Sequence, residues 1–321
     1  MALVPDVSVC IVNWNCREML RDCLASLHRQ DQGVRLETIV VDNASSDGAA
    51  DMIAVEFPEV LLIRNADNRG FSRGNNQAAA QATGRYLFFL NNDTWVPPDT
   101  LSKLVVYSEA HPEVGMIGPR LRDGTGNYQA SYRPKPTLGA LLHRTNLFGL
   151  TGLFRRAYNR YRRDEFDPRQ RREVETLMGA ALFLPRPVFN RCGPWDEDFA
   201  FGGEDLHFSA CVGRHYPLVF LPDVEIVHYG GVSTRQHIGY VASNRLAGYA
   251  RFLRKSGYAR ASVLVYKLAV TLDAPIELFL KGCQYVFRKL TGKEEAARKS
   301  QLACRGARHF LTRGMVSFWR A

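Results

Sequence analysis

Strand-like and helix-like segments alternate along the first ninety residues, and this alternation constrains the fold more than any other feature of the chain. Short apolar runs predict strands over 7–12, 37–41, 60–63 and 86–90. Between them, apolar residues at helical spacing predict helices that begin near Arg17, Ser46 and Ser72. Strands that alternate with helices in this way form a mostly parallel sheet with helices on both faces. The sequence therefore predicts an α/β fold.

A polar residue follows each of several predicted strands. Asn13, Asp42, Asn65 and Asp93 stand at or just beyond the carboxyl ends. Because ligands of open α/β sheets bind outside these ends, we expect the four side chains to face one crevice. Asp42 is placed to accept a hydrogen bond from the imide N–H of a uracil or thymine ring. A single aspartate after a strand is equally typical of a turn or a helix cap.

The run Leu-Phe-Phe-Leu-Asn-Asn-Asp at 87–93 leads from a buried strand to a candidate metal ligand. An oxygen ligand at the end of an apolar strand is a common means of holding a divalent cation against a diphosphate. Asp93 can ligate Mg²⁺ or Mn²⁺ directly, and Asn91 can assist by a hydrogen bond or through a water. The three polar residues are also typical of a plain turn, so the run alone leaves both interpretations open.

Two further stretches carry candidate site residues. In the Asn-Arg-Gly-Phe-Ser-Arg-Gly-Asn-Asn run at 68–76, glycines allow the backbone to approach a ligand and Arg73 can meet a phosphate. Glu204, Asp205 and His228 each stand beside a glycine-containing loop. A carboxylate can serve as a general base, and an imidazole can complete a metal site. Taken singly, these residues are typical of a helix start and a structural histidine.

Composition narrows the class of protein. With 321 residues, 46% of them hydrophobic, the chain is long enough for one large α/β domain with an extension and is not disordered. The formal charge of +10 and the pI near 9.4 indicate an anionic partner. The seven cysteines show no zinc or CxxC spacing, which predicts reduced thiols in a cytosolic protein. We find no signal peptide over 1–9 and no run of the roughly 18–20 apolar residues that a spanning helix needs.

Beyond residue 90 the pattern is less regular. Residues 119–176 show no clear period and predict loops with short helices, with a dense group of arginines between 154 and 173. Two strands and one helix are then predicted, over 176–184, 218–221 and 205–214 respectively.

The chain from about residue 236 to its end predicts helices. Apolar residues of 263–290 recur at helical spacing beside lysines and arginines. This pattern fits either a helix packed on the domain or a helix that lies on an anionic membrane face. Asp273 and Glu277 argue against deep insertion.

A set of short motifs occurs in a distinctive order along residues 7–235. The motifs are Val-Cys-Ile-Val-Asn-Trp-Asn at 9–15, Ile-Val-Val-Asp-Asn-Ala-Ser-Ser-Asp-Gly at 39–48, Asn-Arg-Gly-Phe-Ser-Arg-Gly-Asn at 68–75, Phe-Leu-Asn-Asn-Asp at 89–93, Met-Gly-Ala at 178–180, Gly-Pro-Trp-Asp-Glu at 193–197, Glu-Asp at 204–205 and His-Tyr-Gly-Gly-Val-Ser at 228–233. In this order they resemble family 2 glycosyltransferases with the GT-A fold, most closely the bacterial rhamnosyltransferase-like branch.

The resemblance implies a role for each matching residue. Asp205 would be the catalytic base, with Glu204 as the alternative, and Asp93 and His228 would bind Mn²⁺ or Mg²⁺. Trp195 and Asp196 would face the acceptor. The nucleotide-sugar donor would be bound by Asn13, Asn15, Asp42, Asn68, Arg73, Asn75, Asn92 and Gly179. Two positions depart from the family pattern: Asn91 replaces the first aspartate of a strict DxD, and His207 stands where an acidic residue is common.

The resemblance also implies an inverting single displacement. L-rhamnose from dTDP-rhamnose is the preferred donor prediction, with UDP-glucose, UDP-galactose and GDP-mannose as alternatives. The acceptor would be a hydroxyl of a lipid-linked or cell-surface polysaccharide. We expect a GT-A domain with a single Rossmann-like sheet at 1–235 and a helical extension at 236–321, in a cytoplasmic protein that is peripheral on the inner membrane face. The oligomeric state is not predicted.

Other protein classes fit the sequence less well. A dinucleotide-dependent oxidoreductase needs GxGxxG after its first strand, but Asn-Trp-Asn-Cys-Arg-Glu stands there at 13–18. A nucleotidyltransferase needs a glycine-rich basic loop at the same place, and the chain has none. Arginines interleaved with aromatic residues over 154–173 would suit a nucleic-acid-binding protein. That interpretation leaves the ordered motifs unexplained, so no nucleic-acid partner is predicted.

Overall fold

Strand β1 (Val7–Asn13) pairs in parallel with β2 (Leu36–Asn43) on one side and β4 (Tyr86–Asn91) on the other. Strand β3 (Leu61–Asn65) extends the parallel sheet beyond β2. In this register Asn13 lies opposite Asp42, and Val12 lies opposite Asn91. The four strands predicted in this part of the chain are therefore confirmed, and their polar carboxyl ends lie at one edge of the sheet.

The computed structural model describes residues 4–30, 33–162, 167–199, 201–230 and 238–321. The chain divides into two compact units, each treated separately below. The N-terminal unit contains residues 1–134, 166–200 and 204–233, and the C-terminal unit contains residues 135–165, 201–203 and 234–321. This differs from the predicted division at 235/236, because residues 135–165 and 201–203 cluster with the C-terminal helices and the last part of that unit begins at 234.

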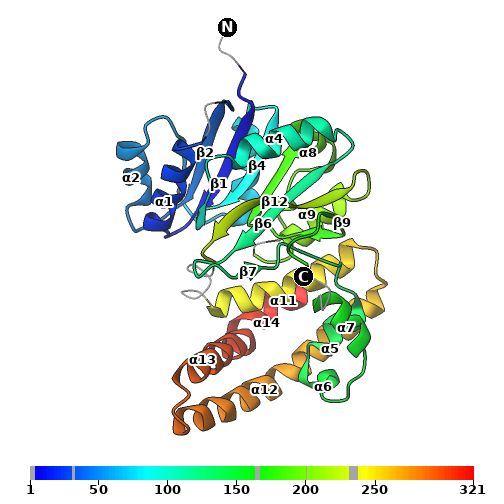
Figure 1. The fold of residues 1–321 in the computed structure, drawn as a ribbon. Coiled ribbons are helices and arrows are strands. Elements are labelled where there is room, and N and C mark those ends of the chain that lie inside the picture. Colours follow the sequence, from blue (N-terminus) through cyan, green and yellow to red (C-terminus); the bar gives the residue numbers. More distant parts are fainter. Residues whose placement is uncertain (1–3, 31–32, 163–166, 200, 231–237) are drawn as a thin grey trace. The chain divides into compact units, whose positions relative to one another are not determined.

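The sheet continues past β4 with strands from the second half of the N-terminal unit, in the order β3-β2-β1-β4-β11-β6-β12-β5 (Figure 1). The added strands are β5 (Thr94–Trp95), β6 (Met116–Arg122), β11 (Ala181–Pro185) and β12 (Leu218–His228). Strand β7 (Tyr128–Gln129) pairs with β6, and β9 (Arg172–Val174) pairs with β12. Strand β11 runs antiparallel to β4, whereas β12 runs parallel to β6. The sheet is mostly parallel, as predicted, with an antiparallel insertion at its centre.

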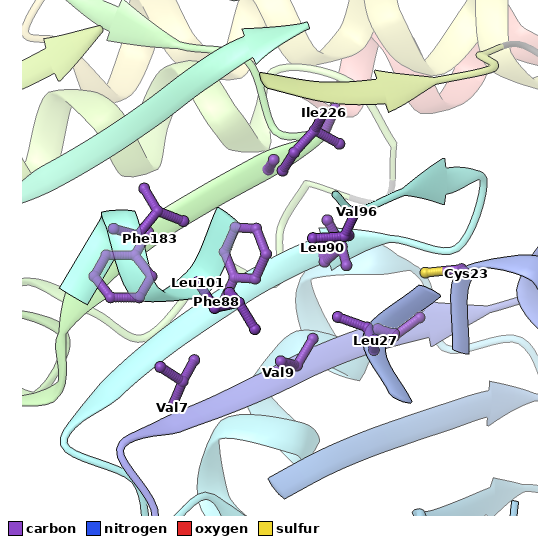
Figure 2. Close-up of a cluster of buried hydrophobic side chains, with 14 of the residues drawn as sticks. Val7, Val9, Cys23, Leu27, Phe88, Leu90, Val96, Leu101, Phe183 and Ile226 are labelled. Carbon is purple, nitrogen blue, oxygen red and sulfur yellow. The ribbon is translucent and has the colours of Figure 1, made fainter. Parts of the chain in front are cut away.

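Helices cover both faces of this sheet. The helices of the N-terminal unit are α1 (Arg17–His28), α2 (Ala49–Glu56), α3 (Phe71–Gln81), α4 (Thr100–Ala110), α8 (Arg186–Cys192) and α9 (Glu204–Val212). Alternate strand residues point to opposite faces, so β4 directs Phe88 and Leu90 to one core and Leu87 and Phe89 to the other. The first core includes side chains of α1, α2 and α4 (Figure 2), and the second includes side chains of α3, α8 and α9.

The strand predicted over 176–184 is two separate strands. Strand β10 (Thr176–Leu177) pairs with β8 (Tyr132–Arg133) in a small ribbon, and β11 joins the main sheet. Between them the backbone N–H of Met178 donates to the carbonyl of Ser131, and the carbonyl of Ala180 accepts from the N–H of Asn91. The continuous apolar pattern correctly predicts burial, but it cannot reveal that the pairing strand changes from β8 to β4. Strand β12 is also longer than the predicted 218–221, because it continues through a bulge after Leu221.

The C-terminal unit is helical, as the sequence predicts. It contains α5 (Leu138–His143), α6 (Asn146–Gly149), α7 (Arg155–Arg162), α11 (Ile238–Lys255), α12 (Arg260–Leu290), α13 (Glu294–His309), a π-helical turn η1 (Phe310–Gly314) and α14 (Met315–Arg320). Helices α5, α11, α12 and α13 line a cavity of about 410 Å³. Among the residues described, no helix combines the length and apolar character needed to span a bilayer.

Candidate active site

Asn13, Asp42 and Asn92 form a connected hydrogen-bond network at the ends of β1, β2 and β4. The Nδ2 atom of Asn13 donates to Asp42 Oδ1 at 2.9 Å, and Asn92 Nδ2 donates to Asn13 Oδ1 at 2.7 Å. The second oxygen of Asp42 accepts from the backbone N–H of Ser45 at 2.9 Å. Asp42 is only 3% exposed, so these bonds fix its carboxylate at the edge of the sheet. A carboxylate has lone pairs beyond these two contacts and can accept one more donor.

The loop after β1 is held against the loop after β2. Asn15 adopts a positive φ of 49°, a conformation that asparagine tolerates better than most residues. Its backbone N–H donates to Ser45 Oγ at 2.9 Å, and its Oδ1 accepts from the N–H of Ser46 at 2.8 Å. The Asn15 side chain is therefore occupied in shaping the loop, and its predicted donor contact stays a prediction.

Asp93 and His228 come together although they lie far apart in the sequence. Strand β5 pairs antiparallel with the end of β12, with His228 opposite Thr94, and this pairing places Asp93 beside the imidazole. Asp93 Oδ1 lies 3.3 Å from His228 Nε2, and the two side chains are 11% and 17% exposed. Asn91 Nδ2 lies 3.3 Å from the same ring nitrogen.

Gln129 fixes the orientation of His228 from the other side of the ring. Gln129 Nε2 donates to the backbone carbonyl of His228 at 2.6 Å, and Gln129 Oε1 lies 2.8 Å from His228 Nδ1. Because a carbonyl can only accept, the amide nitrogen must face it, so Oε1 accepts from a protonated Nδ1. In the neutral ring, Nε2 then presents its lone pair toward Asp93. A hydrogen bond to the other ring nitrogen is the usual means of orienting a metal-ligating histidine.

A cysteine lies beneath the Asp93 loop. Cys23 Sγ is 3.4 Å from Thr94 Oγ1 and 3.8 Å from the carbonyl of Asn91. Burial raises the pKa of the Cys23 thiol to about 12, so it stays neutral at physiological pH. Cys23 is therefore a packing residue and not a thiolate ligand.

Gly179 and Asp205 lie in contact. The backbone N–H of Gly179 donates to Asp205 Oδ2 at 3.3 Å, and Oδ1 accepts from the N–H of Leu206 at 2.8 Å. A Cβ atom on residue 179 would stand 3.2 Å from the Asp205 Cβ, so glycine permits this approach. Since Ala180 accepts from the backbone of Asn91, the Asp205 carboxylate is tied through this short segment to the end of β4.

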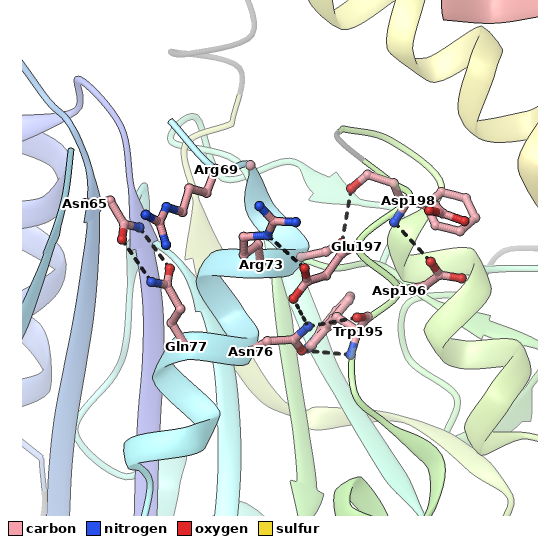
Figure 3. A network of polar contacts seen from close by, with 12 residues as sticks. Asn65, Arg69, Arg73, Asn76, Gln77, Trp195, Asp196, Glu197 and Asp198 are labelled. Atoms are coloured by element: carbon pink, nitrogen blue, oxygen red, sulfur yellow. Dashed lines mark hydrogen bonds and ion pairs between the residues drawn. The ribbon is translucent and has the colours of Figure 1, made fainter. Parts of the chain in front are cut away.

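The segment at 68–76 contributes to packing more than the sequence suggests. Arg73 Nε donates to Glu197 Oε2 at 2.8 Å, so the guanidinium is paired with a carboxylate of the segment after α8 (Figure 3). Asn75 is 1% exposed and donates to the carbonyl of Phe71 at 3.1 Å. Asn68 accepts from the N–H of Gly70 at 2.9 Å, which shapes the turn before α3. These contacts do not support the donor-binding roles expected for the three residues.

The same network holds the segment after α8. Asn76 exchanges hydrogen bonds with the backbone of Trp195 and also donates to Glu197 (Figure 3). Hydrogen bonds from Asn76 and Arg73 keep the pKa of the Glu197 carboxyl below its usual range. The indole of Trp195 is 1% exposed and stacks on Phe208 with 4.4 Å between ring centroids. The indole therefore belongs to the core, and the predicted acceptor contact of Trp195 stays a prediction.

Asp196 remains at the surface of this segment. Its Oδ2 lies 3.7 Å from His207 Nδ1, and its Oδ1 accepts from the N–H of Asp198 at 3.1 Å. The His207 ring stacks on Phe199 with centroids 5.3 Å apart. His207, to which the sequence assigned no role, thus lies beside the Asp196 carboxylate.

Among the described residues, no group of three or more histidine, cysteine or acidic side chains could hold a metal ion. Asp93 and His228 therefore offer two protein ligands. Gln129 is a site residue that the sequence did not reveal, because it lies in the irregular stretch after residue 119 and no periodic pattern marks it.

The comparisons with known proteins agree with this geometry. Residues 8–173 match the family model described as glycosyl transferase family 2. The chain belongs to glycosyl transferase family 2. The glycosyltransferase is 27% identical, over 62% of its own length and 68% of the relative's, to the N-acetylglucosaminyl-diphospho-decaprenol L-rhamnosyltransferase of Mycobacterium tuberculosis. It is also 30% identical to the abequosyltransferase RfbV of Salmonella typhimurium, over 34% of each chain.

Solved structures show the same fold. A mannosyltransferase from Pyrobaculum calidifontis, solved with GDP-Man and Mn²⁺, covers 99% of the glycosyltransferase and 87% of its own chain with a TM-score of 0.56 and 19% identity. GalNAc-T7, solved with UDP, GalNAc and Mn²⁺, covers 77% of the glycosyltransferase and 48% of its own chain, with a TM-score of 0.53 and 15% identity. The GT-A fold expected from the motifs is confirmed. The protein is therefore a glycosyltransferase that uses a nucleotide-sugar donor.

Proposed function

We propose that this glycosyltransferase catalyses inverting transfer of L-rhamnose from dTDP-rhamnose to a hydroxyl of a lipid-linked or cell-surface polysaccharide acceptor. The observation that carries the proposal is the meeting of two groups at the sheet edge. One is the Asn13–Asp42–Asn92 network, and the other is the Asp93–His228 pair. The similarity to a mycobacterial rhamnosyltransferase supports the choice of sugar.

The first group would bind the nucleotide. The Asp42 carboxylate is oriented by Asn13 and by the backbone of Ser45, and its remaining lone pairs can accept from the imide N–H of thymine. A uracil ring carries the same imide group, so Asp42 alone does not distinguish dTDP from UDP. The discrimination between these donors would come from contacts to the methyl group and the sugar.

The residues at the end of β4 fit a divalent cation. Asp93 offers a carboxylate oxygen. His228 offers the lone pair of Nε2, because the contact with Gln129 places the ring proton on Nδ1. Oxygen together with imidazole nitrogen suits Mn²⁺ and also accommodates Mg²⁺. When bound, the cation would neutralise charge on the leaving diphosphate. With two protein ligands, its retention would depend on the donor.

Asp205 would act as the general base. Its two oxygens accept from the backbone N–H groups of Gly179 and Leu206, and these contacts fix the orientation of the carboxylate. Asp205 would take the proton of the acceptor hydroxyl as that oxygen forms a bond to the anomeric carbon. The bond from the anomeric carbon to the phosphate oxygen breaks, and its electron pair leaves with the nucleoside diphosphate. One displacement inverts the anomeric centre without a covalent intermediate.

A donor screen tests the proposal. The thermal shift of the full chain would be measured with dTDP-rhamnose, UDP-glucose, UDP-galactose and GDP-mannose, each with Mn²⁺, Mg²⁺ or EDTA. We expect the largest stabilisation with dTDP-rhamnose and a divalent cation, and slow hydrolysis of that donor by water. Equal stabilisation by all four donors, or a preference for GDP-mannose, would overturn the rhamnosyl assignment.

A further inference from the structure

The positive charge of the protein is confined to its C-terminal unit. That unit contains 24 lysines and arginines and 6 aspartates and glutamates, a formal charge of +18. The N-terminal unit contains 18 basic and 26 acidic residues, a formal charge of −8. The site for the anionic donor thus belongs to the acidic unit, so the excess of cations serves a different anionic partner.

Helix α12 presents an exposed apolar stripe. Its Val263, Tyr266, Val270 and Ala274 are buried against the rest of the C-terminal unit. At about 100° per residue, a second set falls on one other face. The set is 45–82% exposed and includes Leu264, Leu268, Leu272, Phe279, Phe287 and Leu290. Leucine and phenylalanine side chains exposed in a row along a helix mark an interaction surface.

The acidic residues of α12 face away from this stripe. Asp273 accepts from the side chain of Asn146 at 3.1 Å and from the N–H of Leu147 at 3.1 Å, and Glu277 accepts from Asn146 at 2.7 Å. These contacts bind both carboxylates to α6, within the same unit. The sequence-based objection that they oppose membrane contact therefore does not apply to the exposed stripe.

Cations border the stripe. On the same helical projection Arg260 and Lys289 lie along one edge of it, where long side chains can reach polar headgroups while their stems cover apolar surface. Lys267 lies near the same edge, but its Nζ donates to the backbone carbonyl of Trp319 at 2.9 Å. Arg260 and Lys289 are exposed. Arg288 is different, because its Nη1 donates to the carbonyl of Ala296 and to Ser300 Oγ, and so it joins α12 to α13.

We propose that the α12 stripe docks the enzyme on an anionic lipid bilayer, with the stripe at the boundary between headgroups and acyl chains. Charge decides this occupant, since pairing the stripes of two copies would bring together two units that each carry a charge of +18, whereas an anionic leaflet attracts such a unit. An amphipathic helix with a basic border lies in the plane of the membrane and does not span it. The inference deepens the proposed function and rests on it for the lipid-linked acceptor that gives docking a purpose.

Vesicle flotation of the full chain tests the proposal. We expect binding to vesicles that contain phosphatidylglycerol, weak binding to pure phosphatidylcholine vesicles, and a fall in binding at high salt. The variant Phe279→Gln/Phe287→Gln/Leu290→Gln removes exposed side chains, so it should fold normally and lose binding by about tenfold or more. A matched control in the other unit is Val55→Gln/Val106→Gln, whose side chains are 80% and 65% exposed. The control should bind as the wild type does.

Removing the charges of the two exposed cations beside the stripe tests the electrostatic contribution to vesicle binding. Arg260→Gln/Lys289→Gln should reduce vesicle binding by about 10- to 30-fold at low salt, since each surface cation contributes about fivefold. Flotation needs neither donor nor acceptor, so its failure would leave the proposed transfer reaction intact. The proposal would be overturned if the wild-type protein did not bind anionic vesicles. The proposal would also be overturned if the wild-type protein were a dimer that dissociates in the triple variant, because the stripe would then bind a second copy of the chain.

Discussion

Gln129 holds His228 by two hydrogen bonds, one to the backbone carbonyl at 2.6 Å and one to the ring Nδ1 at 2.8 Å. The first bond determines which way the amide faces, and the amide in turn determines which ring nitrogen carries the proton. Gln129, which the sequence did not reveal as a site residue, thus leaves the lone pair of His228 Nε2 pointing at Asp93.

Replacing Gln129 should weaken metal binding without touching a metal ligand. We expect Gln129→Ala to lower Mn²⁺ affinity by about 10- to 100-fold in the presence of dTDP, because the His228 ring loses its fixed tautomer. Titration followed by electron paramagnetic resonance measures free Mn²⁺ directly. Gln129→Glu retains an acceptor for Nδ1–H and should recover part of the affinity, while Gln77→Ala should have none of these effects. Unchanged Mn²⁺ affinity in Gln129→Ala would show that the two hydrogen bonds between Gln129 and His228 are not needed for metal binding.

Asp93→Ala should remove the cation requirement together with donor affinity. The proposed cation joins the protein to the diphosphate, so losing the carboxylate should lower affinity for the nucleotide sugar by about tenfold or more. Calorimetry with and without EDTA gives the measurement. Asp99→Ala is the matched control, because this exposed aspartate pairs with Lys103 and lies only six positions further on. Wild-type transfer that persists in excess EDTA would contradict the metal assignment.

Asp205→Asn should abolish transfer while the donor still binds. Loss of a general base costs on the order of 10²–10⁴ in rate, whereas the nucleotide contacts at Asp42 are unaffected. Product formation and donor thermal shift would be measured in parallel. Glu204→Gln is the adjacent control. If Glu204→Gln proves the more damaging change, the base is Glu204.

Gly74→Ala should destabilise the N-terminal unit. A Cβ atom at this position would lie 2.8 Å and 2.9 Å from the two methyl groups of Val12, so α3 could no longer pack against β1 at its present distance. Overpacking of this kind costs about 1–3 kcal/mol of unfolding free energy. Gly33→Ala serves as the control, since no atom of the described residues outside its chain neighbours lies within 4 Å of the added atom. Urea unfolding curves that coincide for the two variants would refute this packing argument.

Asp6 should stabilise the fold at neutral pH and cease to do so in acid. Hydrogen bonds from Arg35 and Arg85 lower the pKa of Asp6 to about 2. Because the folded-state value lies below the unfolded one, the stabilisation is complete above about pH 4 and is lost as pH falls through about 2. Asp6→Asn should therefore cost about 1–2 kcal/mol at neutral pH, and the difference from wild type should vanish near the acid limit.

The Asp6 experiment also has an internal comparison. Asp67 pairs with Arg69 at 3.2 Å, but its side chain is 72% exposed. Solvent screens such a pair, so Asp67→Asn should change stability by no more than about 0.5 kcal/mol. Urea unfolding of the three proteins across this pH range decides the matter. A constant difference between wild type and Asp6→Asn at every pH would argue against linkage.

Local sequence patterns were enough to predict the parallel half of the sheet and the helical character of the C-terminal unit. Strands β1, β2 and β4 each bury both faces, and their apolar runs end abruptly at Asn13, Asp42 and Asn91. Such signals are local, because side-chain periodicity reflects the geometry of a single element. Parallel pairing then brings strand ends to one edge without further information, which is why the Asn13–Asp42 contact could be anticipated.

The way in which later segments of the chain complete the site is visible in the folded protein and not in the sequence. The β5–β12 pairing puts His228 beside Asp93, and β7 brings Gln129 behind the ring. The same level of structure pairs Arg73 with Glu197 and buries Trp195, two residues whose types had suggested ligand contacts. Pairing between distant segments depends on which surfaces they bury together. The neighbours of a residue in the sequence do not show which distant segment it will contact.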